Sequence, residues 1–238
     1  MVTLDFEGEL AIITIDRPEA RNAIAPDTMD ELDKAIDAAH GARALAITGG
    51  GDRVFVSGGD LKELAKLRSL DDARQMAWRM RGICDRIVAF PAPVVAALNG
   101  HALGGGAEFA TAADIRIAAD DVRIGFNQSA LAIMPAWGGL ERLVSLVGPS
   151  RATLLAGTGR MLSSGEALEV GLVDQVLPRA DFDTGWRRIA GSLATAPASG
   201  IKKVVRGATA EEAVEEFAQL WVSDEHWTAA DRVLKRNK

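Results

Sequence analysis

The chain has 238 residues, of which 48% are hydrophobic and 25% charged, and its formal net charge is −6. These values are typical of a soluble globular protein with a sizeable core, and they argue against a dedicated nucleic-acid binder, which usually carries a basic face. The single cysteine, Cys84, excludes a disulfide within the chain and a CxxC metal site, and we expect no bound metal ion.

The start of the chain and its hydropathy predict where the protein resides. Residues 1–16 include acidic but no basic residues, and no stretch approaches 18 uninterrupted apolar residues. We therefore expect neither a signal peptide nor a transmembrane helix. A cytoplasmic protein without membrane contact is the resulting prediction.

The first half of the chain alternates strand and helix patterns. Apolar runs predict strands at 10–16, 44–48 and 93–98, a strand beginning at Val54, and two short strands within 114–126. Residues 27–39 and 70–89 have the apolar spacing of helices. Strands that alternate with helices indicate a layered α/β core with parallel pairing.

The second half is predicted to be largely helical. Helical patterns cover 139–147, 149–157, 164–170, 184–195 and 209–223, with one short strand at 172–176. Ser163 and Glu166 have the spacing of a capping box. We therefore divide the chain into an α/β core, residues 1–183, and a helical C-terminal assembly region, residues 184–238. Trp221, Trp227 and Leu234 make this region too apolar to stand alone in water, which favours an oligomer.

Two strands run into glycines and then into helices, in FVSGGDLKEL and GHALGGGAEF. The first backbone N–H groups of a helix have no partner within the helix, and glycines allow a ligand to approach them closely. If both junctions face one cleft, two N–H groups can converge on one oxygen as an oxyanion hole. Glycine turns that merely reverse the chain are the alternative.

Glu108 is a lone carboxylate in an apolar helical stretch. It follows Gly105 by three positions, so both share one face of the helix. A carboxylate placed there can shuttle a proton, although capping of the helix is the alternative role.

The two glycine segments, FVSGGDLKEL and GHALGGGAEF, resemble in their order and spacing the signature segments of the crotonase (enoyl-CoA hydratase/isomerase) family. The segments RPEARNAI at 17–24, IMPAWGGLERL at 133–143 and ALEVGLVDQVL at 167–177 are also similar to the family pattern. The resemblance implies a crotonase-like spiral of ββα units with a helical C-terminal region that assembles a homotrimer or a hexamer, a dimer of trimers.

The resemblance also implies a ligand and its contacts. The ligand is an acyl-CoA thioester, so coenzyme A enters as part of the substrate and no cofactor is permanently bound. The N–H groups of Gly59 and Gly105 are implied to hold the thioester oxygen. The residues implied to bind substrate or CoA are Arg21, Ala23, Gly58, Asp60, Leu61, Lys62 and Trp137.

The reaction is where the sequence departs from the family pattern. Hydratases of the family use two glutamates: the first matches Glu108, but Gln128 occupies the place of the second. An amide orients a water without accepting its proton. Because ALGGGAEFATAAD and MPAWGG are similar to the branch that decarboxylates ethylmalonyl-CoA and methylmalonyl-CoA, we expect a lyase that decarboxylates a malonyl-type CoA ester through an enolate. The alternatives are an enoyl-CoA hydratase or isomerase with Glu108 as lone acid/base, and a catalytically silent acyl-CoA-binding protein.

Overall fold

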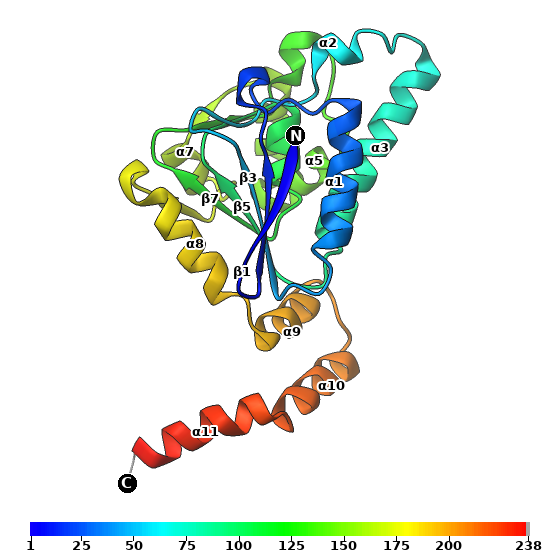
Figure 1. Ribbon diagram of the computed structural model, residues 1–238. Coiled ribbons are helices and arrows are strands. Elements are labelled where there is room, and N and C mark those ends of the chain that lie inside the picture. Colours follow the sequence, from blue (N-terminus) through cyan, green and yellow to red (C-terminus); the bar gives the residue numbers. More distant parts are fainter. Residues whose placement is uncertain (237–238) are drawn as a thin grey trace.

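The computed structural model describes residues 1–236, which form an α/β body and a C-terminal arm, residues 196–236 (Figure 1). The body contains a six-stranded sheet of order β1-β2-β3-β5-β7-β10 and a four-stranded sheet of order β4-β6-β8-β9. The predicted α/β class is therefore confirmed. The last two residues of the predicted assembly region, 237–238, lie outside the described residues.

The strands have the following bounds: β1 Val2–Glu7, β2 Leu10–Ile15, β3 Ala44–Gly49, β4 Val54–Val56, β5 Val94–Leu98, β6 His101–Leu103, β7 Ile115–Ala119, β8 Arg123–Gly125, β9 Leu162–Ser163 and β10 Gln175–Leu177.

The helices and 3-10 turns have the following bounds: η1 Pro18–Ala20, α1 Pro26–Ala38, α2 Leu61–Leu64, α3 Leu70–Val88, α4 Gly105–Ala110, η2 Asn127–Leu131, α5 Gly139–Val147, α6 Pro149–Thr158, α7 Ser164–Glu169, η3 Arg179–Asp181, α8 Phe182–Ser192, α9 Ala196–Val205, α10 Ala210–Trp221 and α11 Asp224–Arg236.

The main sheet is the centre of the hydrophobic core. β2, β3 and β5 are almost entirely buried apolar runs, as expected of parallel strands covered on both faces. They pair in parallel, with Ile13 opposite Ile47 and Leu45 opposite Val94. Helices α1 and α3 cover one face of the sheet and α8 covers the other (Figure 1).

Most of the predicted elements are confirmed. The strands predicted at 10–16, 44–48 and 93–98 are β2, β3 and β5, and the helix predicted at 139–147 coincides with α5. The capping box of Ser163 and Glu166 forms at the start of α7. The strand predicted at 172–176 is wrong in its start, because Leu172 and Val173 lie in the turn after α7 and the strand begins at Gln175.

Several short or polar elements were not predicted. β6 and β9 have only three and two residues, too few for a periodic pattern. α9 and α11 were not predicted either. Pro197 lies in the first turn of α9, where proline is tolerated. The predicted boundary between residues 183 and 184 falls within α8, whose Phe182 and Trp186 are buried in the body.

The small sheet brings the two glycine segments together. β4 and β6 are parallel neighbours, with Val54 opposite His101 and Val56 opposite Ala102. Because parallel strands end at the same edge, the glycines that follow β4 and those that follow β6 lie side by side. This edge is where the candidate site forms.

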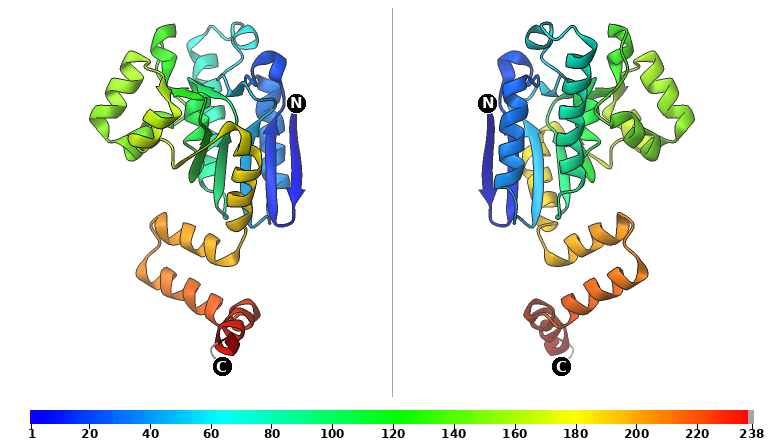
Figure 2. Two further views of the ribbon diagram at one scale, coloured as in Figure 1. Left: turned by 90° about the vertical axis from the view of Figure 1, so that its left-hand side faces the viewer. Right: turned by 90° about the vertical axis from the view of Figure 1, so that its right-hand side faces the viewer.

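The arm extends away from the body, as the two side views show (Figure 2). α9 is anchored by Asp114, whose carboxylate pairs with Lys202 at 2.8 Å and with Arg206 at 2.6 Å. Beyond α9, the aromatic side chains of α10 and α11 are substantially exposed, including Phe217 and Trp221. No helix within the described part of the chain is both long and apolar enough to cross a membrane.

Candidate active site

Gly58, Gly59 and Gly105 meet at the shared edge of β4 and β6. A Cβ atom added to Gly58 would lie 3.2 Å from the Gly105 nitrogen. The N–H of Ile24 donates to the Gly58 carbonyl at 2.8 Å, and the N–H of Asp60 donates to the Ile24 carbonyl at 2.9 Å. The Gly58 C=O and the Gly59 N–H belong to one trans peptide bond and point in opposite directions. Because the C=O faces Ile24, the Gly59 N–H points away from Ile24. Within residues 1–236, neither the Gly59 nor the Gly105 N–H group has a protein acceptor.

The glycines after β6 are required by their backbone conformation and by neighbouring atoms that leave no room for a side chain. Gly104 has a positive φ of 54°, which L side chains rarely adopt. A Cβ at Gly106 would lie 1.8 Å from the Val56 carbonyl oxygen, so only glycine allows α4 to pack directly on β4. These residues place the N-terminus of α4, with the Gly105 N–H, beside Gly58, and Glu108 follows one turn later.

Glu108 is buried, with 2% of its surface exposed, and its carboxylate is surrounded by four donors. Oε1 accepts from Gln128 Nε2 at 2.8 Å and from the Ala136 N–H at 3.3 Å. Oε2 accepts from the N–H groups of Trp137 at 2.8 Å and Gly139 at 3.1 Å. Burial raises the pKa of Glu108 above its ordinary value, and the four hydrogen bonds oppose that rise.

The donors from 136–139 depend on a second glycine contact. A Cβ at Gly139 would lie 2.4 Å from the Glu108 Cβ, so a larger residue would push the loop away from the carboxylate. Gly138 has a φ of 80°, which turns the chain so that the amides on both sides of it face Glu108. The sequence showed this only as the pair of glycines after Trp137, and neither Ala136 nor Gly139 was predicted to touch Glu108.

Gln128 lies in η2 and is also buried, with 6% exposed. Its Nε2 donates to Glu108, while its Oε1 is buried and has no hydrogen-bond partner within the described residues. Buried polar atoms are normally hydrogen-bonded, so an orphaned acceptor beside a carboxylate is a position for a ligand or water that donates a hydrogen bond.

The Trp137 side chain packs directly on the glycines. Its ring atoms Cη2 and Cζ3 would each lie 2.5 Å from a Cβ on Gly105, and Cζ2 would lie 3.8 Å from a Cβ on Gly59. The Arg142 guanidinium donates to the Trp137 carbonyl at 2.6 Å. Of the residues that the resemblance implied to bind substrate, Trp137 and Gly58 thus border the amides directly.

The remaining implied residues have more varied surroundings. Asp60 accepts from the Lys62 N–H at the start of α2 and pairs with Arg17 at 3.2 Å, so its carboxylate is already engaged. Arg17 also donates to the Ala23 carbonyl at 2.6 Å, a link that was not predicted. Leu61 and Lys62 are exposed on α2.

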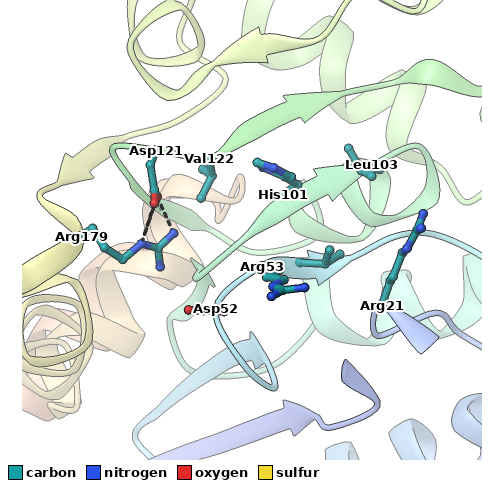
Figure 3. Close-up of a pocket in the computed structure, with 9 residues that line it drawn as sticks. Arg21, Asp52, Arg53, His101, Leu103, Asp121, Val122 and Arg179 are labelled. Carbon is teal, nitrogen blue, oxygen red and sulfur yellow. Dashed lines mark hydrogen bonds and ion pairs between the residues drawn. The ribbon is translucent and has the colours of Figure 1, made fainter. Parts of the chain in front are cut away.

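Arg21 lines a surface cavity of about 570 Å³ next to the small sheet (Figure 3). Arg53 and His101 line it as well, and the ion pair of Arg179 with Asp121 stands at one end. Asp52 also lines the cavity, so its lining carries both signs of charge, with Arg21 and Arg53 as the cations available to an anionic group.

The fold thus brings two glycine N–H groups without a protein acceptor among residues 1–236 close to a buried carboxylate that accepts four hydrogen bonds. The enoyl-CoA hydratase/isomerase family model matches residues 5–225. The chain belongs to the enoyl-CoA hydratase/isomerase family, and the family resemblance noted in the sequence is confirmed.

Known relatives agree with this assignment. The chain is 36% identical over 195 residues to a short-chain-enoyl-CoA hydratase of Clostridium acetobutylicum, covering 81% of this chain and 74% of that protein. It is 37% identical over 195 residues to a crotonyl-CoA hydratase of Syntrophomonas wolfei, covering 81% and 75%. The crystal structure of an enoyl-CoA hydratase from Thermoplasma volcanium superposes with a TM-score of 0.87 at 31% identity, covering 97% of this chain and 96% of that one. The crotonase-like fold is thereby confirmed.

Proposed function

We propose that the protein hydrates the double bond of an enoyl-CoA thioester, with Glu108 as its only acid/base. The observation that carries this proposal is the buried pair of Glu108 and Gln128 beside two unpartnered glycine amides. The Gln128 Oε1, which lacks a donor, can accept one hydrogen bond from a water molecule. Glu108 Oε1 can accept the other when the weakly bound Ala136 N–H withdraws. The hydratase alternative thus replaces decarboxylation as the leading function, and the names of the relatives favour it.

The proton balance of hydration closes with one carboxylate. The water oxygen bonds to the β-carbon, its proton passes to Glu108, and the electron pair of the double bond moves onto the thioester oxygen as an enolate. The N–H groups of Gly59 and Gly105 stabilise that oxygen. Glu108 then returns the proton to the α-carbon, so that H and OH of one water are added and no second glutamate is required.

Oε1 is the Glu108 oxygen that receives the proton at least cost. All four lone-pair directions of the carboxylate are occupied, so protonation requires one donor to withdraw. The Ala136 N–H on Oε1 is the longest of the four bonds, at 3.3 Å. The same oxygen contacts Gln128, which places the proton transfer next to the proposed water.

Decarboxylation is less well supported by the surroundings of Glu108 than hydration is. A malonyl-type carboxylate beside Glu108 would experience repulsion between like charges. Within residues 1–236, no lysine or arginine side chain hydrogen-bonds to Glu108 or Gln128 to offset it. Isomerisation requires one base and no water, so it leaves the orphaned Gln128 Oε1 unexplained.

The test is turnover of three thioesters, followed by liquid chromatography and mass spectrometry. We expect crotonyl-CoA to gain the mass of one water, with little conversion of trans-3-hexenoyl-CoA and no CO2 from methylmalonyl-CoA. Release of CO2 without hydration would restore decarboxylation. Binding of all three without any product would indicate the catalytically silent acyl-CoA-binding protein.

The remaining expectations are part of the same proposal. Arg21 is proposed to meet a phosphate of CoA, since it lines a surface cavity together with Arg53 and with Leu103 of the small sheet. The arm is proposed to complete a homotrimer or a dimer of trimers, because its exposed aromatic residues need a partner surface. The cytoplasm is the proposed location.

A further inference from the structure

We infer that Trp137 and Leu64 form the end wall of the acyl site and restrict the protein to short acyl chains, of the size of a butyryl group. The inference rests on the proposed function insofar as the thioester oxygen is taken to lie at the Gly59 and Gly105 amides. It assigns to Trp137 and Leu64 the choice of substrate length.

The two side chains lie against Gly59 and Gly105, on the side where a Cβ atom would stand, and so border the amides. The Trp137 ring lies where Cβ atoms on Gly105 and Gly59 would point, at 2.5 and 3.8 Å, and Leu64 Cδ1 lies 2.6 Å from the Cβ position of Gly59. An acyl chain whose carbonyl oxygen sits on both amides therefore meets the indole ring or Leu64 within a few carbon atoms.

Trp137 is held in place by backbone hydrogen bonds as well as by the packing of its ring. Trp137 is 6% exposed, so the ring has no route into solvent without unpacking the loop. Its N–H donates to Glu108 and its carbonyl accepts from Arg142, both at short distance. A shift of the Trp137 backbone to admit a long chain would break a hydrogen bond on the Glu108 carboxylate. Long substrates should therefore lose turnover as well as affinity.

The expected chain-length profile follows from hydrophobic burial. In an open apolar channel each further methylene raises affinity about fourfold. A wall removes this gain, so affinity should stay level or fall from butyryl- to octanoyl-CoA.

The experiment measures dissociation constants of free CoA and of butyryl-, hexanoyl- and octanoyl-CoA by isothermal titration calorimetry. Saturated esters need no turnover, so the result is independent of which reaction the protein catalyses. The variants are Trp137→Leu, which removes the ring, and Leu64→Ala, which opens the wall from the other side and tests the inference even if the first variant does not fold. Trp78→Leu is the matched control, because Trp78 is exposed on α3.

We expect wild type and Trp78→Leu to bind octanoyl-CoA no more tightly than butyryl-CoA, and each wall variant to raise the octanoyl preference at least tenfold. A wild-type affinity that rises about fourfold per methylene, or wall variants with an unchanged profile, would overturn the inference. Absence of crotonyl-CoA hydration together with the expected binding profile would refute the proposed function and leave the inference standing.

Discussion

At the scale of single residues, the Glu108 carboxylate is balanced between burial and hydrogen bonding. Burial disfavours its charge, whereas three backbone N–H groups and the Gln128 amide stabilise that charge. Under the proposed function Glu108 must be ionised to accept a proton, so these donors are expected to determine the acidic limb of the activity profile.

Replacement of Gln128 by leucine removes one donor from the carboxylate and should raise the Glu108 pKa further. A hydrogen bond to a charged group is worth about 1.5 kcal/mol, which corresponds to about one pKa unit. Because activity requires the ionised form, the acidic midpoint of kcat/KM should move to higher pH by about that amount. The control is Gln219→Leu, which removes an exposed glutamine that donates to Glu215. An unchanged midpoint in Gln128→Leu would contradict the role of Gln128 as a donor to the base.

Gly105 provides a second test at this scale. In Gly105→Ala the new Cβ would overlap the Trp137 ring, and the loop that presents the N–H must shift. Loss of one such donor lowers kcat by roughly 10²–10³-fold, and we expect a loss of that size with the melting temperature changed much less. Gly82→Ala is matched, since its Cβ meets nothing within 4 Å on α3. Full activity of Gly105→Ala would refute the assigned role.

At the scale of secondary structure, the parallel pairing of β4 with β6 brings the two glycine segments of the candidate site together. Separately, ion pairs of Asp114 hold α9 against the body. The Lys202 ammonium is mostly buried, where it pairs with Asp114 at 2.8 Å and donates to the Ala92 carbonyl at 3.0 Å. Desolvation lowers the pKa of Lys202, while Asp114 opposes that change.

Lys202→Met should lower the free energy of unfolding by about 1–3 kcal/mol, because it leaves the half-buried Asp114 carboxylate with one fewer donor. Neighbouring Lys203 pairs with Glu216 on the surface, so Lys203→Met should change stability little. Chemical denaturation of both variants makes the comparison. Equal stability of the two would show that the Asp114 contacts do not fasten α9.

The sequence predicts elements well where burial imposes a pattern. β2, β3 and β5 were recognised because strands covered on both faces read as apolar runs. The glycine segments were recognised because consecutive glycines stand between a strand and a helix. The contact of Gln128 with Glu108 links positions 20 apart, and the donors at 136–139 depend on how the loop before α5 folds over α4. Such long-range contacts have no local signature, so only the structure shows that Glu108 is fully hydrogen-bonded and that Gln128 Oε1 is not.

At the scale of the whole molecule, the arm is the feature that a single subunit does not explain. Phe217 and Trp221 have ring centroids 5.6 Å apart, and Trp221 and Trp227 are also 5.6 Å apart. Trp221 and Trp227 are each 47% exposed, so the cluster forms an apolar surface on a segment that extends away from the body (Figure 2). Large exposed patches of this kind mark interaction sites.

Light scattering should therefore find a trimer or hexamer at micromolar concentration. The double variant Phe217→Ser, Trp221→Ser should shift it towards smaller species, because it removes apolar surface from the proposed contact. Trp78→Ser, which alters an exposed tryptophan on α3 instead, should leave the mass unchanged. A wild-type protein that is monomeric under these conditions would contradict the assembly proposal.

The most direct measurement of the central claim is incorporation of oxygen from H2¹⁸O into crotonyl-CoA, read by mass spectrometry for wild type and Glu108→Gln. We predict that wild type yields 3-hydroxybutyryl-CoA carrying one ¹⁸O atom. General acid–base catalysis contributes roughly 10²–10⁴-fold, so the rate in a folded Glu108→Gln variant should fall by about that factor. An absence of ¹⁸O incorporation by wild type, or equal rates for the two proteins, would contradict the account of Glu108 as the lone acid/base of a hydratase.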